Sequence, residues 1–479
     1  MRALMVQGTS SWAGKSLIAA ALCRHFARRG LRVAPFKAQN MSNNARVVPG
    51  GEIGAAQYLQ ALAARVEPDV RMNPVLVKPE GMTRSQVIVR GVASPTMSQL
   101  PWRERSPHLW PAISESLHSL MAEYDLLVLE GAGSPAELNL MDTDVTNRRS
   151  AEEADAQVLL VTDIDRGGAF AHLYGTWALV GQDARRRVRG FVLNKFRGDP
   201  SLLPPAPEKL EALTGVPVLG VIPMFHHHLP DEDGAAMPPE NVAAVATVAI
   251  VRYPFASNLD EFKLLEQIVQ VRWARRRADL AGADIAVLPG SKNVGSDLEW
   301  LRATGLDEAV CARAQSGLRV LGICGGLQML GRELHDPAGI DASGRGLGLL
   351  PLATTFHSQK LVRRAAIRFH DRLPEPWSPL AAKLVRGYEI RHGRTVELAD
   401  TVAAIDGDLG WIQDAVLGIT VHGLFEDAEV LGALFGRAPH HTLDSAIDAM
   451  TDVVVANLDM ARIDGLVRAP GLVSNVRPE

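Results

Sequence analysis

The chain has 479 residues, more than one hydrophobic core usually organises, so we expect two domains of roughly 200 residues each. Hydrophobic residues make up 47%, charged residues 22%, and the formal net charge is -4, a balance that favours a globular protein and argues against nucleic-acid binding. No apolar stretch approaches the ~20 residues of a membrane span. The start of the chain does not look like a cleaved signal peptide. With only three cysteines and no paired spacing among them, the sequence predicts a cytoplasmic protein.

Short apolar segments alternate with helix-like segments through residues 1–225, which we expect to form the first domain. Helix-like patterns occupy 15–29 and 51–65. The strand-like segments lie at 3–7, 31–36, 125–130, 156–163 and 190–195. This alternation predicts a mostly parallel sheet with helices on both faces.

The alternation of strand-like and helix-like segments ends near residue 225 and resumes near residue 246. Residues 226–245 combine charge, Gly and Pro without periodicity and are predicted to be a linker. We interpret the three adjacent histidines at its start as part of this linker, since neighbouring side chains point in different directions. Residues 246–435 are predicted to form a second α/β domain, and 436–479 a helical C-terminal tail.

The segment from Gly8 to Ser16, "GTSSWAGKS", lies between a predicted strand and a predicted helix. It is one residue longer than the G-x4-G-K-[ST] phosphate loop but keeps its Gly14-Lys15-Ser16 end. In such loops backbone N–H groups cradle phosphate, the lysine neutralises charge and the hydroxyl binds Mg²⁺. We therefore predict nucleotide binding at Gly8, Thr9, Gly14, Lys15 and Ser16.

Polar side chains at other strand ends complete the predicted nucleotide site. Glu130 follows an apolar strand and should emerge at the carboxyl edge of the sheet, where α/β sheets bind ligands. It is a candidate Mg²⁺ ligand, the alternative being a solvated loop glutamate. Glu52 is a weaker second candidate. Asn194 also follows a strand and is predicted to meet the nucleotide base.

Cys324 lies in the second domain, in "VLGICGGLQMLG", between an apolar strand and an apolar helix. Its glycine neighbours give the pattern G-x-C-x-G, the thiol counterpart of the strained elbow that exposes a nucleophile. A thiol nucleophile needs a base, and His422 follows another apolar strand. We predict a Cys324–His422 pair.

The rest of that site is less complete in the sequence. Triads that hydrolyse glutamine commonly carry a glutamate two residues after the histidine, but Leu424 stands there. Either Glu426 substitutes or the site works as a Cys–His pair. Gly290, in the strand-end turn "LPGSKN", and Gly325 are predicted to supply the two N–H groups of an oxyanion hole.

Together these motifs resemble the cobyric acid synthases, in the same order and over nearly the full length. The resemblance rests on the long phosphate loop and on "PFKAQNMSNN", "GGEIGAAQYLQALAA", "MNPVLVKP", "LEGAGSPAELNL", "TDIDRGGAFA", "VLNKFRGD", "LPGSKN", "GICGGLQMLG", "GYEI" and "VHGLFED". It implies an α/β fold with two parts: an N-terminal ATP-binding amidoligase domain of the dethiobiotin synthetase type, with a parallel sheet and a phosphate loop, and a C-terminal domain similar to class I glutamine amidotransferases.

The resemblance also implies an activity. ATP, Mg²⁺ and glutamine would drive amidation of the b, d, e and g carboxylates of adenosylcobyrinic acid a,c-diamide, a corrinoid, to give adenosylcobyric acid. Cys324 would attack glutamine, with His422 as proton shuttle.

Further residue roles follow from the same resemblance. Lys37 would neutralise charge on the transferring phosphate, and Glu52 and Glu130 match metal-binding acids. Gln39, Asn40 and Asp144 are expected to contact the substrate.

One residue departs from the family pattern, because Arg391 stands where "GYEIH" would place a histidine. Three alternatives remain at this point. A cobyrinic acid a,c-diamide synthase would share both sites, although "FKAQNMSNN" argues against it. A nucleotide switch of the partitioning type would share the phosphate loop. In the third alternative, the amidotransferase half is degenerate and the protein relies on free ammonia.

Overall fold

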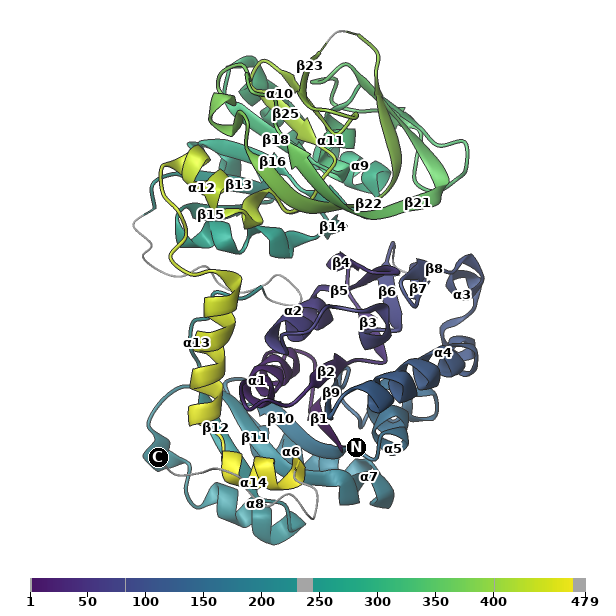
Figure 1. Cartoon of the computed structure of the whole chain (residues 1–479), viewed down its shortest axis with the longest axis vertical. Coiled ribbons are helices and arrows are strands. Elements are labelled where there is room, and N and C mark those ends of the chain that lie inside the picture. The colour runs from purple at the N-terminus through teal and green to yellow at the C-terminus, as the bar shows by residue number, and fades with distance from the viewer. Residues whose placement is uncertain (1, 82, 231–243, 400, 468–479) are drawn as a thin grey trace.

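The computed structural model describes every residue except 1, 82, 231–243, 400 and 468–479. Figure 1 shows two lobes, with the first part of the chain in the lower one and the green, later part in the upper one. Each lobe is built around its own central sheet. No described helix has the length and apolar character that a membrane crossing requires.

The lower sheet has six parallel strands made of nearly continuous apolar residues. Their order is β12 (Val218–Pro223), β11 (Val188–Phe196), β10 (Gln157–Asp163), β1 (Arg2–Gly8), β9 (Leu126–Glu130) and β2 (Val33–Phe36). The main helices around it are α1 (Lys15–Arg28), α2 (Ala55–Ala63), α4 (Trp102–Glu123), α5 (Ser150–Glu153), α6 (Ala169–Leu179), α7 (Gln182–Arg187) and α8 (Ala206–Thr214). Strands buried on both faces are typical of parallel sheets, and the predicted α/β class is confirmed.

A small sheet and a hairpin extend this lobe toward the upper one (Figure 1). The sheet contains β3 (Gln39–Met41), β6 (Val75–Pro79), β7 (Ser85–Val89) and β8 (Val92–Ala93), followed by α3 (Pro95–Gln99), and the hairpin pairs β4 (Ala45–Val48) with β5 (Gly51–Gly54). The helix predicted from residue 51 therefore begins only at Ala55. Gly50 and Gly51 adopt φ values of 88° and 149°, which favour a tight turn and not a helix start.

The upper sheet has seven strands. Their order is β15 (Gln270–Ala274), β13 (Thr247–Val251), β16 (Ile285–Leu288), β18 (Arg319–Ile323), β25 (Val416–Ile419), β24 (Gly410–Gln413) and β23 (Val402–Ile405). The first five are parallel and the last two antiparallel. Helices α9 (Val294–Thr304), α10 (Leu306–Gln315), α11 (Gly325–Leu330) and α12 (Ala428–Phe435) accompany the sheet. A long hairpin of β21 (Leu352–Arg368) and β22 (Leu384–Glu397) packs between this sheet and the lower lobe (Figure 1).

The tail returns to the lower lobe. Helices α13 (Leu443–Ala456) and α14 (Met460–Val467), yellow in Figure 1, share a buried apolar cluster with α1 and the lower sheet. Asp459 N donates to Leu219 O on the edge strand β12 at 2.6 Å, and Arg28 pairs with Asp452 at 2.5 Å. Within the predicted tail, these two helices extend to residue 467, and its bounds stay a prediction. Most of the predicted linker, at 231–243, lies outside the described residues.

Candidate functional site

The phosphate loop connects β1 to α1 and packs against the end of β11. Gly14 has φ 97°, and a Cβ there would lie 2.0 Å from Asn194 Nδ2, so only glycine fits. Asn194 Nδ2 donates to Ala13 O at 2.8 Å. Thr9 Oγ1 lies 2.9 Å from Thr162 Oγ1. The structure thus brings the predicted loop residues and Asn194 together, with Asn194 touching the loop itself.

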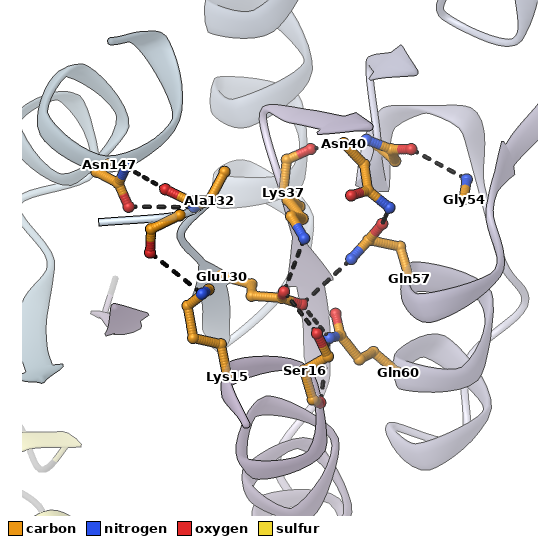
Figure 2. A network of polar contacts seen from close by, with 12 residues as sticks. Lys15, Ser16, Lys37, Asn40, Gly54, Gln57, Gln60, Glu130, Ala132 and Asn147 are labelled. Atoms are coloured by element: carbon orange, nitrogen blue, oxygen red, sulfur yellow. Dashed lines mark hydrogen bonds and ion pairs between the residues drawn. The ribbon is translucent and has the colours of Figure 1, made fainter. Parts of the chain in front are cut away.

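Glu130, at the end of β9, is buried and collects donors from three segments of the lower lobe (Figure 2). Its Oε1 accepts from Ser16 Oγ and from Lys37 Nζ, both at 2.8 Å. Its Oε2 accepts from Gln57 Nε2 at 3.2 Å and from Gln60 Nε2 at 2.5 Å. A hydroxyl and a carboxylate side by side are oxygen donors that suit Mg²⁺.

Lys15 lies across the mouth of the same loop. Its Nζ donates to Ser10 O at 2.9 Å and to Gly133 O at 3.2 Å, so it joins the phosphate loop to the loop after β9. A Cβ on Gly8 would approach this ammonium to 3.0 Å. The lysine is therefore placed where a bound phosphate would meet the backbone N–H groups of the loop.

Of the predicted substrate residues, Asn40 joins the hydrogen-bond network of Glu130. Asn40 is buried, and its Nδ2 donates to Gln57 Oε1 at 3.1 Å (Figure 2). Gln39 precedes it on β3 and is partly exposed. Asp144 Oδ1 accepts from Asn147 N at 2.8 Å, and burial raises the pKa of Asp144. Their contact with substrate stays a prediction.

Asn147 fixes the loop after β9 to this segment. Its Nδ2 donates to Ala132 O at 2.8 Å and its Oδ1 accepts from Ala132 N at 3.1 Å. Asp144 therefore supports the loop that carries Gly133, the residue whose carbonyl meets Lys15. Asp144 and Asn147 therefore have a local structural role.

Glu52, on β5, has different partners from Glu130. Its carboxylate pairs with Lys78 of the lower lobe and with Lys360 of β21 in the upper lobe. Burial alone would raise the pKa of Glu52, but the two ammonium groups lower it to about 2. The described residues contain no group of three or more metal-ligating His, Cys, Asp or Glu side chains. The structure joins Ser16 to Glu130 but pairs Glu52 with lysines, and its role as a metal ligand stays a prediction.

A cavity of about 990 Å³ opens beside the phosphate loop. Its lining includes Gly14, Lys15, Ser16 and Asn194 of the lower lobe and Asp260 and Glu426 of the upper lobe. This volume is in the range of small-molecule sites. The histidines 226–228 also border the cavity, where the ring of His228 stacks on that of His441 at 4.7 Å.

Cys324 occupies the elbow between β18 and α11. Its φ of 51° and ψ of -104° are strained for a residue with a side chain, as expected for a nucleophile elbow. A Cβ on Gly326 would lie 1.9 Å from Leu288 O, and one on Gly322 would lie 2.7 Å from Leu327 N. The flanking glycines are therefore required by close backbone approach.

His422 is buried beside Cys324 and is held by Glu261, which no sequence motif indicates. Glu261 Oε1 lies 2.8 Å from His422 Nδ1, and Glu261 Oε2 accepts from Gly423 N at 2.8 Å. Burial alone would lower the pKa of His422, but the charge of Glu261 and the hydrogen bond with Cys324 raise it to about 10. Cys324, His422 and Glu261 thus form a connected set. Glu426, the predicted candidate, pairs with Arg46 instead.

Glu261 lies far from His422 in the sequence, in the turn "NLDEF" shortly after β13. The available signal is a pair of acids, Asp260 and Glu261, between Leu259 and Phe262. All four residues are buried. Adjacent buried acids need partners, but the sequence does not say which ones.

The two predicted oxyanion glycines flank the pair. A Cβ on Gly290 would lie 2.8 Å from His422 Cε1, and one on Gly325 would lie 2.6 Å from Ser291 N. The turn after β16 and the start of α11 are therefore in van der Waals contact beside Cys324. Arg391, at the position of the family histidine, is buried and its Nε donates to Glu389 Oε1 at 2.7 Å.

The fold and the two sites define a class of protein: a glutamine amidotransferase domain joined to a phosphate-loop nucleotide-binding domain. Family models agree, since residues 4–229 match the CobQ/CobB/MinD/ParA nucleotide binding domain and residues 247–430 match the CobB/CobQ-like glutamine amidotransferase domain.

Relatives cover nearly the whole chain. A cobyric acid synthase from Variovorax paradoxus is 56% identical, covering 97% of this chain and 99% of its own. Another from Paracidovorax citrulli is 57% identical, covering 94% and 95%. A third, from Polaromonas sp., is 50% identical, covering 98% and 99%. The chain belongs to the cobyric acid synthase family. It is a glutamine-dependent amidoligase of cobalamin biosynthesis, as the motifs predicted.

Proposed function

We propose that the chain uses ATP and glutamine to amidate the b, d, e and g carboxylates of adenosylcobyrinic acid a,c-diamide, giving adenosylcobyric acid. The observation that carries this proposal is the presence of two separate sites in one chain. A carboxylate does not react with ammonia at neutral pH, so one site must activate the acid and the other must release ammonia. The phosphate loop suits the first task, and the Cys324–His422 pair suits the second.

In the upper lobe, the thiolate of Cys324 attacks the side-chain carbonyl carbon of glutamine. The carbon–nitrogen bond breaks, His422 gives a proton to the leaving nitrogen, and ammonia departs while a thioester remains. Water then hydrolyses the thioester to glutamate and restores the thiol. Glu261 orients the imidazole and stabilises its protonated form. The N–H groups near Gly290 and Gly325 would bind the oxyanion.

In the lower lobe, the substrate carboxylate would attack the γ-phosphorus of ATP. The bond from that phosphorus to the β–γ bridging oxygen would break, ADP would leave, and an acyl phosphate would form. Ammonia then displaces phosphate and leaves the amide. Lys15 and Lys37 would neutralise negative charge on the phosphates. Asn194 would lie beside the nucleotide at the wall of the cavity.

The oxygen donors Ser16 and Glu130 fit Mg²⁺, and Glu52 is a further proposed ligand. The metal would supply charge neutralisation for the phosphate oxygens. In this structure Lys37 donates to the same Glu130 oxygen as Ser16, so the lysine stands next to the place proposed for the metal. Lys37 is therefore also close to where the phosphoryl group would transfer.

Two alternatives from the sequence have less support. The connected Cys324, His422 and Glu261 side chains support a working glutaminase instead of a degenerate one. The matched amidotransferase domain and the full-length relatives favour an enzyme over a partitioning switch. We also infer a cytoplasmic location, which the three free cysteines support.

The substrate is tested by incubating the chain with the a,c-diamide, ATP, Mg²⁺ and glutamine and following the products by mass spectrometry. We expect four successive losses of one mass unit, one for each acid converted to an amide. Cobyrinic acid itself, offered in a parallel reaction, should not be converted at its a and c carboxylates. Amidation at those two positions would instead support an a,c-diamide synthase.

A further inference from the structure

The turn that carries Glu261 is attached to the lower lobe by a reciprocal pair of hydrogen bonds. Ala45 N donates to Asn258 Oδ1 at 3.1 Å, and Leu259 N donates to Asn44 Oδ1 at 3.1 Å. Asn258 has φ 55°, a left-handed conformation that asparagine tolerates better than most residues. The start of β4 in the nucleotide-binding lobe thus holds the first two residues of the Asn258–Glu261 turn in the amidotransferase lobe.

Arg46, two residues after Asn44, makes a second attachment at the same place. Its Nε donates to Asp260 Oδ2 at 2.8 Å, and its guanidinium also pairs with Glu426. It lies over the ring of Tyr388, 5.1 Å from the centroid. Arg46 and Asp260 are both buried. A buried ion pair of this kind fixes geometry, since removing one partner leaves the other charge uncompensated.

These contacts reach His422 from two sides. Asp260 precedes Glu261, whose carboxylate meets His422 Nδ1 at 2.8 Å. On the other side, the ring of Tyr388 stacks on the His422 ring at 5.3 Å with an interplanar angle of 18°. His422 N also donates to Tyr388 O at 2.9 Å. The residues that orient the imidazole are therefore the ones that the lower lobe holds.

We propose that Asn44 and Arg46 of the nucleotide-binding lobe are positioning residues for glutamine hydrolysis: they hold the Asn258–Glu261 turn and Tyr388, and through them they set the orientation of His422. Full glutaminase activity then requires the two lobes to be docked at β4. This inference rests on the glutaminase proposed above for Cys324. The glutaminase activity of the upper lobe then depends on Asn44 and Arg46 of the lower lobe.

The first test measures glutamate production from glutamine in three full-length variants. Asn44→Ala removes one acceptor, and we expect kcat to fall about tenfold, the equivalent of one hydrogen bond, with a smaller change in KM. Arg46→Met should lower kcat about 100-fold, the size expected for a misplaced catalytic group. Arg46→Lys keeps a cation for Asp260 and should recover part of this loss. Ammonia-driven amidation by Asn44→Ala should remain at the wild-type rate.

A matched control breaks a different contact between the lobes. Arg364 of β21 pairs with Glu67 of the lower lobe at 2.5 Å, and both side chains are exposed. Arg364→Met should keep wild-type glutaminase activity, since this pair does not touch the Asn258–Glu261 turn. An equal loss in this variant would show that any loosening of the interface lowers activity, and it would overturn the specific role of Asn44 and Arg46.

The second test asks whether Asn44 acts through Glu261. In a Glu261→Gln background, Asn44→Ala should cause little further loss of kcat, because the oriented carboxylate is already absent. A full tenfold loss in that background would overturn the proposal, as would wild-type kcat in both Asn44→Ala and Arg46→Met. Failure of the proposed glutaminase itself would look different, since Cys324→Ala would then still produce glutamate.

Discussion

Glu130 in the lower lobe and His422 in the upper lobe are both buried side chains at the end of a central strand, but different parts of the chain hold them. The four donors to Glu130 come from the phosphate loop, the residue after β2 and helix α2, all within the first 60 residues. His422 is held by Glu261, and the turn of Glu261 is in turn held by Asn44 and Arg46 of the other lobe.

The two sites differ in which lobes hold their side chains in place. The site at Glu130 is organised by its own lobe, so its chemistry should depend mainly on local residues. The site at His422 extends across the interface, so it should respond to changes in both lobes. Four further variants test this difference, in order of decreasing expected effect.

Replacing Cys324 separates the two sites most completely. We expect Cys324→Ala to lower glutamine-driven amidation by on the order of 10⁴-fold or more, because the proposed nucleophile is lost. Amidation driven by added ammonium chloride should continue, since Glu130 and its donors are untouched. Both reactions are measured by corrinoid mass spectrometry. Equal loss with both nitrogen donors would contradict the assignment of nitrogen release to the upper lobe alone.

Replacing Lys15 is the converse experiment. Lys15→Ala should lower ATP-dependent amidation about 10³-fold with either nitrogen donor, since the charge proposed to stabilise the transferring phosphate is removed. Glutamate production in the absence of corrinoid should persist, because Lys15 contacts Ser10 and Gly133 of the lower lobe. Unchanged amidation would show that the phosphate loop is not the activating site.

Replacing Glu261 tests the third member of the upper site. Glu261→Gln should lower glutaminase kcat about 100-fold. The carboxylate holds the pKa of His422 near 10, above its usual 6.5, so its removal should lower that pKa and move the basic limb of the pH profile to lower pH. The ion pair stabilises the fold fully below about pH 6.5, and this contribution disappears as pH rises through 10. A basic limb at the wild-type pH would contradict the role given to Glu261.

Replacing Glu52 distinguishes an ion pair between the lobes from a metal ligand. Glu52→Gln leaves Lys78 and Lys360 without their carboxylate and should lower the free energy of unfolding by about 3 kcal/mol at pH 7. The pKa of Glu52 is about 2 instead of 4.5, so its stabilisation is complete above pH 4.5 and is lost as pH falls toward 2.

The stability difference between Glu52→Gln and wild type should therefore shrink in acid, as measured by chemical denaturation across pH. Titrating Mg²⁺ in the amidation assay separates the two roles. A higher Mg²⁺ requirement with unchanged stability would favour metal binding over the ion pair. Lys360→Met should share the stability loss without that Mg²⁺ effect.

Strand-end residues could be predicted from the sequence, because a parallel strand leaves a clear apolar pattern and its carboxyl end points to the ligand side. This is why the phosphate loop, Glu130, Asn194, Cys324 and His422 were selected. Glu261 was missed since it lies in an irregular turn, where no periodicity shows which buried acid faces which histidine. The hairpin of β4 and β5 could not be predicted either, because Glu52 and Ile53 directly precede helix α2 and their pattern resembles its first turn.

Local motifs also carried no information about contacts between the lobes. The pairing of Glu52 with Lys360 joins positions more than 300 residues apart, and the sequence has no alternation that would indicate it. The same holds for Arg46 and Asp260. Such contacts depend on how the surfaces of two folded lobes dock. Periodicity within a short segment of sequence carries no information about this docking.

Helices α13 and α14 make the lower lobe discontinuous along the chain. The polypeptide leaves this lobe after β12 and comes back to cover α1, so the amidotransferase behaves as an insertion tethered at both of its ends. Two chain connections limit how far the amidotransferase lobe can move from the lower lobe. They therefore keep the site that releases ammonia within a limited distance of the site that uses it. A fragment ending near residue 230 would also lose the apolar cover of α1, so we expect it to aggregate when expressed alone.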